Sequence, residues 1–215
     1  MFKNYLKIAL RNIRKYKGYS FINITGLVIG ITVCLFLIQL IRYELSYDGF
    51  HKDADRIYRI VDRNSSRTQA SLSNALVDMF PEVEQAGRVM FFDGFIRIED
   101  ALVQNQRIYF ADPEIMEIFS FPAESSYDRK TLSEPFSILI TRRTASKYFG
   151  TDDPVGKTIS FVNRVDFHVK GVLKDIPENA HFRFDFIASM STLRSIYGQN
   201  VLTGWGSRDF FTYFR

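Results

Sequence analysis

The segment Gly150 to Thr158, GTDDPVGKT, has the Gly-Lys-Thr ending of a loop that binds nucleotide phosphates. Such a loop has four residues between its two glycines, so that successive backbone N–H groups converge on the phosphates. Here five residues separate Gly150 from Gly156; two are aspartates, which would repel a phosphate, and Pro154 has no N–H to donate. A helical pattern precedes the glycines and a strand pattern follows them, the reverse of the order around a phosphate-binding loop. The segment therefore predicts a turn and not an ATP site.

The histidines offer no pattern that would hold a metal ion. His51, His168 and His181 are far apart in the sequence and form no H-x-x-x-H or H-E-x-x-H motif. Glu178 and His181 make one E-x-x-H, whereas a metal site in a helical bundle needs two such pairs and further acids. The nucleophile elbow G-x-S-x-G is also missing from the sequence. We therefore predict no catalytic residue, no metal and no cofactor, and we do not expect an enzyme.

Three carboxylates near His51 leave two interpretations open. Asp48, Asp53 and Asp55 surround this histidine in the sequence, and the D-x-D spacing could bind a cation. The other ligands of a calcium loop are missing, which favours a solvated, charged turn just outside a membrane.

A long apolar segment predicts a membrane anchor. No charged residue occurs from Gly18 to Ile41, and residues 21–41 read FINITGLVIGITVCLFLIQLI. As a helix these residues would extend about 31 Å, which matches the ~30 Å hydrocarbon core of a bilayer. We predict a transmembrane helix over residues 18–42, too long for a signal peptide and without an A-x-A-like cleavage site. Gly26 and Gly30 form a G-x-x-x-G pattern, and we expect them to let another helix approach closely.

The basic residues are concentrated before this apolar segment. Six of the 28 Lys and Arg residues precede Gly18, where no acid occurs, and the other 22 face 24 acids. The six are Lys3, Lys7, Arg11, Arg14, Lys15 and Lys17. This bias predicts a cytoplasmic N-terminus, so that residues from about Tyr43 onward lie outside the cytoplasm, in the periplasm where the cell has one. The outer region is slightly acidic, which argues against nucleic acid as a partner.

Residues 1–17 combine these cations with apolar residues at helical spacing. We predict an amphipathic helix at the cytoplasmic membrane surface, with Lys7, Arg11, Arg14 and Lys15 directed toward lipid headgroups. A plain topology signal is the alternative interpretation. The single cysteine, Cys34, lies in the apolar segment, so the outer region must fold without an intrachain disulfide.

The outer region predicts a mixture of strands and helices. Strands are expected over residues 56–62, 87–92, 95–98, 107–110, 136–140, 158–162, 166–173 and 182–188. Helices are expected over residues 69–80, 112–119 and 141–149. Asp112 and Thr141 are the predicted N-caps of the second and third helices, and Gly150 is the predicted stop of the third. The first helix lies between two strands as in a β-α-β unit, whose strand pairing the spacing does not define.

Five segments resemble ABC-transporter permeases of the MacB/FtsX type. They are LKIALRNIRKYKGYSFINITGLVIGI (residues 6–31), YELSYDGFHKDADRIYRIV (43–61), YFADPEIMEIFSFP (109–122), ILITRRTASKYFGTDDPVGKTISF (138–161) and VKGVLKDIPENAHFRFDFIASM (169–190). Their order matches the first transmembrane helix and the MacB-like periplasmic core domain of that family. In proteins of this kind, FG-x-x-x-P-x-GK marks a passage from helix through turn to strand.

The resemblance implies a membrane-anchored α+β fold, in which one N-terminal transmembrane helix precedes a partial extracytoplasmic mixed α/β domain over residues 43–215. It also implies contact with membrane lipid, a cytoplasmic ABC ATPase, a second permease in a homo- or heterodimer, and a periplasmic partner. Because one helix cannot enclose a path through a bilayer, we expect the front section of an inner-membrane permease that serves export or transmembrane signalling. The alternative is a stand-alone, membrane-tethered binding module.

Overall fold

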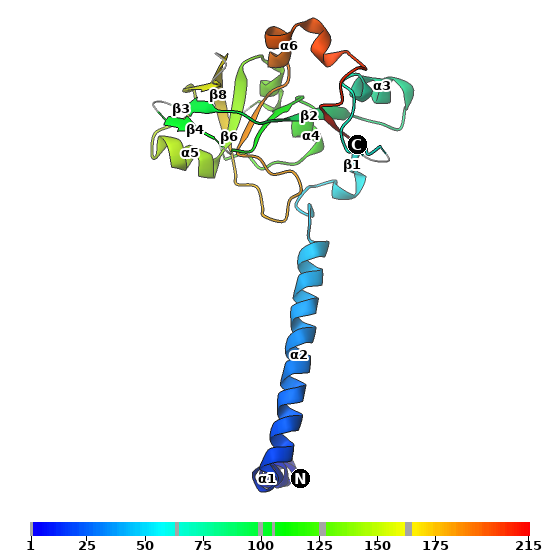
Figure 1. Ribbon diagram of the computed structural model, residues 1–215, viewed down its shortest axis with the longest axis vertical. Coiled ribbons are helices and arrows are strands. Elements are labelled where there is room, and N and C mark those ends of the chain that lie inside the picture. Colours follow the sequence, from blue (N-terminus) through cyan, green and yellow to red (C-terminus); the bar gives the residue numbers. More distant parts are fainter. Residues whose placement is uncertain (1, 63–64, 99–100, 105, 125–127, 162–164) are drawn as a thin grey trace. The chain divides into compact units, whose positions relative to one another are not determined.

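A computed structural model gives the structure of the chain (Figure 1). It describes residues 2–62, 65–98, 101–104, 106–124, 128–161 and 165–215. The chain divides into two compact units, Met1–Tyr47 and Asp48–Arg215.

The first unit consists of two helices, α1 (Phe2–Lys15) and α2 (Lys17–Leu45). The backbone of Tyr16 leaves the helical conformation between them, at φ −114° and ψ 59°. At 1.5 Å per residue α2 is about 43 Å long, more than the hydrocarbon core of a bilayer requires. Of the helices in the described residues, α2 alone is long and apolar enough to cross a membrane, and it has no buried residue. The predicted span of residues 18–42 lies entirely within it.

The second unit is built on a mixed sheet whose ten described strands follow the order β1-β10-β2-β5-β9-β6-β8-β7-β3-β4. The strands are β1 (Tyr58–Arg59), β2 (Ala86–Phe92), β3 (Ile96–Ile98), β4 (Ala101–Val103), β5 (Ile108–Ala111), β6 (Ser137–Thr141), β7 (Thr158–Phe161), β8 (Val165–Leu173), β9 (Phe186–Ser189) and β10 (Phe211–Phe214). Two neighbouring pairs are parallel, β5 with β9 and β6 with β8, and the other pairs are antiparallel. The fold is therefore mixed α+β, as predicted.

Each face of this sheet has its own apolar core, because successive side chains of a strand point to opposite faces. On β9, for example, Phe186 belongs to one core and Ile187 to the other. The helices of this unit are α3 (Leu72–Met79), α4 (Ile115–Ile118), α5 (Arg142–Phe149) and α6 (Thr192–Tyr197), with 3-10 turns η1 (Ala54–Arg56), η2 (Arg129–Ser133) and η3 (Gln199–Leu202). The first core includes residues of α5 and α6, and the second includes residues of α4 and η2. Helices therefore cover both faces.

Several predicted elements differ from the structure. The strand predicted over 56–62 is reduced to β1, and the one predicted over 182–188 begins only at Phe186. The strand predicted over 158–162 ends at Phe161, and its last residue lies outside the described residues. Strands β4 and β10 and helix α6 were not predicted. In the predicted β-α-β unit, β1 and β2 run in the same direction, but β10 lies between them and pairs with both.

The third predicted helix is confirmed at both ends. Thr141 is the N-cap of α5, and its hydroxyl accepts a hydrogen bond from the backbone N–H of Thr144 at 3.4 Å. Gly150 follows the helix at φ 62° and ψ −118°, a backbone conformation that only glycine adopts readily.

Candidate functional site

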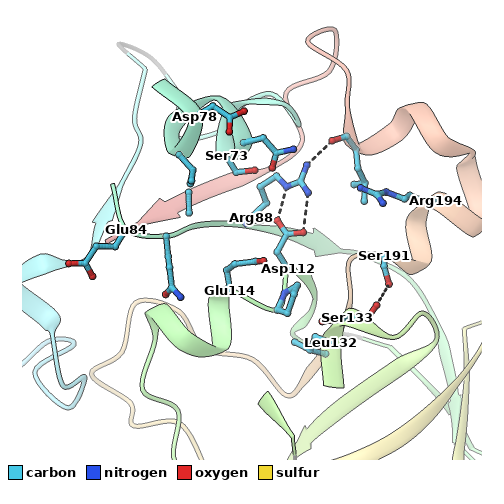
Figure 2. A pocket seen from close by; sticks show the side chains of 16 residues that line it. Ser73, Asp78, Glu84, Arg88, Asp112, Glu114, Leu132, Ser133, Ser191 and Arg194 are labelled. Carbon is cyan, nitrogen blue, oxygen red and sulfur yellow. Dashed lines mark hydrogen bonds and ion pairs between the residues drawn. The ribbon is translucent and has the colours of Figure 1, made fainter. Parts of the chain in front are cut away.

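A crevice lies at the carboxyl ends of the parallel strands β5 and β9 (Figure 2). The chain leaves β5 into α4, which packs on one face of the sheet, and leaves β9 into α6, which packs on the other. When the connections after two adjacent parallel strands diverge in this way, a crevice opens between them, and ligands of open α/β sheets bind there. Helix α3 adds the third side. The space measures about 600 Å³, which is within the range of small-molecule sites.

An ion pair between Arg88 and Asp112 forms the floor of the crevice (Figure 2). Arg88 is on β2 and only 4% exposed, and Asp112 is the residue directly after β5. The guanidinium donates from Nε to Oδ2 at 2.7 Å and from Nη2 to Oδ1 at 3.0 Å, while the backbone N–H of Arg88 also donates to Oδ2 at 2.9 Å. This bidentate geometry is the strong form of the Arg–carboxylate interaction.

The same guanidinium ties two further segments to the floor. Its Nη1 donates to the carbonyl oxygens of Ala70, before α3, and of Leu202, at the end of η3, at 2.7 and 2.8 Å. The ring of Phe210 lies 5.7 Å from its central carbon. Arg88 therefore joins segments of the chain that are distant in the sequence, and its donors are used inside the protein.

Asp112 was predicted as the side-chain cap of the helix that follows it, and that prediction is wrong. The first residue before α4 is Glu114, and no side chain caps this helix. The carbonyl oxygen of Asp112 accepts the N–H of Ile115 at 3.1 Å, but its carboxylate turns to Arg88. A buried arginine requires a paired carboxylate, and this requirement is stronger than the preference of an exposed helix end for a cap.

The walls of the crevice are mainly polar. They contain hydroxyl, amide and charged side chains together with a few apolar ones. The residues of the walls include Ser73, Val77, Asp78, Glu84, Glu114, Leu132, Ser133, Ser191, Arg194 and Leu202. Glu84 has basic partners, Arg56 at 2.5 Å and Arg215 at 3.5 Å. Glu114 is half-buried, and burial raises the pKa of its carboxyl above the ordinary value, with Asp112 adding to the rise. The hydroxyl of Ser191 donates to the carbonyl oxygen of Ser133 at 3.2 Å.

A second polar cluster begins at Asp48, the first residue of the second unit. Its carboxylate accepts from the backbone N–H of His181 at 3.0 Å and lies 2.7 Å from the Nδ1 of the same residue. Its own N–H donates to the carbonyl oxygen of Asn179 at 3.0 Å. The Nε2 of His181 lies 3.2 Å from the hydroxyl of Tyr213, whose pKa burial raises to about 12.

His51 has its ring buried among aromatic side chains, although residues next to it in the turn are exposed. It is 5% exposed, its ring centroid lies 3.9 Å from that of Phe50 and 5.0 Å from that of Phe119, and its Nδ1 accepts the N–H of Ser120 at 3.2 Å. Burial lowers its pKa to about 4. The neighbouring carboxylates have different partners. That of Asp48 binds His181, and that of Asp53 pairs with Arg215 at 3.3 Å. The structure thus gives no support to a cation site here, and the turn around the buried His51 is mostly exposed, with Lys52 and Asp55 at its surface.

Two sets of residues singled out from the sequence lie on the first unit. Lys7, Arg11, Arg14 and Lys15 fall within a stripe of about 100° on α1, at 100° per residue, and all four are exposed. Gly26 and Gly30 lie one turn apart on α2, and a Cβ added to either would meet no atom within 4 Å. Neither set is near the crevice in the sequence or belongs to its walls.

The segment 150–158 forms the predicted turn between helix and strand. It follows α5 and leads into β7, and the N–H of Gly156 donates to the carbonyl oxygen of Val169 at 2.8 Å. The amine of Lys157 lies 3.1 Å from the carboxylate of Asp152 and 5.0 Å from the centroid of the Phe149 ring. The lysine of this segment thus lies beside a carboxylate, which would repel a nucleotide phosphate.

Residues 20–212 match the family model of the MacB-like periplasmic core domain. The chain belongs to this family. The match includes most of α2 and nearly all of the second unit, so the resemblance seen in the sequence is confirmed. A comparison with curated proteins found no match.

Solved structures of low sequence identity share the fold of this family member. A domain assigned to a permease protein from Porphyromonas gingivalis is 21% identical, with a TM-score of 0.65 over 75% of each chain. The periplasmic region of MacB from Actinobacillus actinomycetemcomitans is 16% identical, with a TM-score of 0.55 over 74% of this chain and 72% of that one. The extracellular domain of the ABC-type transporter YknZ from Gram-positive bacteria is 15% identical, with a TM-score of 0.53 over 74% and 81%.

The residues of the crevice were not predicted from the sequence. Arg88 stands in the apolar strand sequence AGRVMFF, and an arginine at such a position must find a buried partner. This signal would have pointed to an ion pair, but it does not name Asp112, which follows a different strand. Glu114 lines the crevice because of the direction in which the chain leaves β5 toward α4. The spacing of nearby residues does not reveal that direction.

Proposed function

We propose that the chain is the front section of an ABC permease subunit, in which α2 anchors the protein and residues 48–215 form its extracytoplasmic domain. The observation that carries this proposal is the single family match over residues 20–212, which joins an apolar helix of membrane-spanning length to the folded domain. A cytoplasmic ATPase would supply the energy, and the domain would respond to it in export or transmembrane signalling. No step of this activity requires a catalytic residue in the chain itself.

Coupling to an ATPase is tested by co-purification from the native membrane. The full protein encoded at the locus is tagged, solubilised in a mild detergent and isolated, and the bound proteins are identified by mass spectrometry. An ATP-binding subunit should be recovered in near-stoichiometric amount. A tagged single-span membrane protein from the same cells is the control, and equal recovery with the control would argue against the proposal.

We infer the orientation from the Lys and Arg residues on each side of the apolar segment, six before it and only Arg42, Lys52 and Arg56 in the 15 residues after it. We place Lys7 in the cytoplasm and Lys52, an exposed residue of the second unit, outside it. In the Lys52→Cys variant an impermeant maleimide should label cells whose outer envelope is permeabilised, whereas Lys7→Cys should react only after the inner membrane is opened. The opposite pattern would reverse the orientation. Unsubstituted protein, which keeps Cys34, gives the background.

A stand-alone binding module is the second candidate, and the crevice is the observation that favours it. Under that alternative the full protein would bind a ligand but would carry no ATPase with it. The same co-purification therefore separates the two functions.

A further inference from the structure

The crevice contains a carboxylate that forms no ion pair with any residue that the structure describes. Glu114 is half-buried, and its carboxylate has no ion-pair partner among the described residues. Two other acids of the lining differ, because Asp112 is paired with Arg88, and the exposed Glu84 with Arg56 and Arg215. A carboxylate removed in part from water gains most from a cation that enters the same space.

We propose that the crevice binds an organic cation, an ammonium or guanidinium group carried on an apolar stem, with Glu114 as its counter-charge. Asp78 of α3 lines the same crevice and adds a second negative charge near the entrance. The crevice, formed where the connections after β5 and β9 diverge, supplies a concave space that a row of surface acids would lack.

An anion is the less suitable ligand, because the buried basic side chain of the lining, Arg88, already binds groups of the protein. The guanidinium of Arg88 is engaged by the carboxylate of Asp112 and by the carbonyl oxygens of Ala70 and Leu202. The remaining basic residue of the lining, Arg194, is exposed to solvent at the side of α6. A charge in that position attracts an anion only weakly, because water and salt screen it.

The lining also suits the stem and the donors of such a ligand. Val77, an exposed residue of α3, offers apolar surface for methylene groups, as the stems of lysine and arginine side chains require. Ser133, an exposed residue of the lining, carries a hydroxyl group that can accept a hydrogen bond from an ammonium group. A lysine or arginine side chain of a short peptide and a free polyamine share this chemistry, and a volume of about 600 Å³ admits either.

This inference deepens the proposed function and rests on it for the ligand's role, although binding itself needs no ATPase. Calorimetric titration of the detergent-solubilised 215-residue chain provides the test. The probes are N-acetyl-Ala-Lys-Ala-amide, the same peptide with norleucine in place of lysine, and spermidine. Because the peptide ends are blocked, the two peptides differ only in the ammonium group.

We expect saturable binding of at least one cationic probe, about tenfold tighter than that of the norleucine peptide. Glu114→Gln should weaken this binding about tenfold, whereas Glu82→Gln, at an exposed position outside the lining, should leave it unchanged. Binding by the lysine peptide alone identifies peptides as the source of the cation, and binding by spermidine alone identifies free polyamines. Asp78→Asn is a second variant at an exposed position and should weaken binding by a smaller factor.

Three results would overturn the proposal. They are equal affinity for the lysine and norleucine peptides, no saturable binding of either cation up to millimolar concentration, and unchanged binding after Glu114→Gln. The near-ultraviolet circular dichroism of each variant establishes that its fold is intact. Because these titrations contain no ATPase, their outcome is independent of whether an ATP-binding subunit co-purifies.

Discussion

Arg88 on β2 and Asp112, directly after the neighbouring antiparallel strand β5, form a buried, bidentate ion pair with Nε and Oδ2 2.7 Å apart. The pair supports the floor of the crevice and, through two carbonyl oxygens, holds the segments before α3 and at the end of η3. Loss of either partner would leave a buried charge without compensation.

We predict that Arg88→Met lowers the free energy of unfolding by about 3–5 kcal/mol, because Asp112 would remain buried and unpaired. The measurement is chemical denaturation of the detergent-solubilised chain, followed by near-ultraviolet circular dichroism. Arg97→Met, at an exposed position on β3, is the matched control and should change stability by less than about 0.5 kcal/mol. The double variant Arg88→Met/Asp112→Leu should regain much of the loss, and equal losses in the single and double variants would contradict this account.

The contact between Asp48 and His181 should also support the second unit. Asp48→Ala removes the acceptor of two contacts and places alanine at a φ of 56°, so we expect a loss of about 1–3 kcal/mol. Asp48→Asn keeps one acceptor and tolerates the positive φ, so it should lose less. Asp55→Ala, at an exposed position nearby, is the control. A loss no greater than that of Asp55→Ala would show that this contact contributes nothing.

Gly150 tests the interpretation of the segment 150–158 as a turn. Alanine there would meet no atom within 4 Å, yet it would have to adopt φ 62° and ψ −118°, at a cost of about 1–3 kcal/mol. Gly206→Ala is the matched control, since its surroundings are equally open and its φ is not positive. Unfolding of both variants is followed by the same denaturation. Equal stability of the two variants would refute the assigned role of the backbone.

His51 predicts a decline of stability in acid. Its pKa is about 4 in the folded chain, against an ordinary value of 6.5 for an exposed histidine, so the unfolded chain binds the proton first as the pH falls. The contribution of His51 is therefore complete above pH 6.5 and is lost as the pH falls toward 4. Denaturation at several pH values should give a slope that His51→Gln reduces and His168→Gln, at an exposed position, retains. An unchanged slope in His51→Gln would contradict the assignment.

Gly26 and Gly30 predict a packing surface on α2 for a second permease helix. Gly26→Leu should lower the yield of the dimer, because a larger side chain prevents close approach of the helices. Val28→Leu, on another side of the same helix, is the control. Chemical cross-linking in native membranes and size-exclusion chromatography in mild detergent measure the dimer. A yield equal to that of Val28→Leu would remove the proposed role of these glycines.

The elements that could be predicted from the sequence are those specified locally. The apolar run FSILI with Thr141 after it predicts β6 and the start of α5, because a buried strand and an N-cap each depend on a few adjacent residues. The alternation of Phe182, Phe184 and Phe186 predicted a strand from residue 182. All three rings are buried, but only the backbone from Phe186 joins the sheet, since alternation reports burial and not a hydrogen-bonded neighbour.

The strand and the crevice that were not predicted depend on contacts between residues that are distant in the sequence. Strand β10 exists because Phe211 to Phe214 pair with β2, more than a hundred residues earlier in the chain. The crevice has the same origin, since Arg88, Asp112 and Glu114 meet its walls only after β2, β5 and β9 have paired. No spacing rule contains that information.

Hydrogen exchange in the complex of the full protein with its ATPase tests the central claim most directly. If ATP binding moves the extracytoplasmic domain, the change enters that domain at Asp48, whose N–H is bonded to Asn179 and whose carboxylate is bonded to the N–H of His181. The account predicts that a non-hydrolysable ATP analogue changes the exchange protection of the amides of Asp48 and His181. Identical protection with and without the nucleotide, in a complex that binds it, would contradict the account.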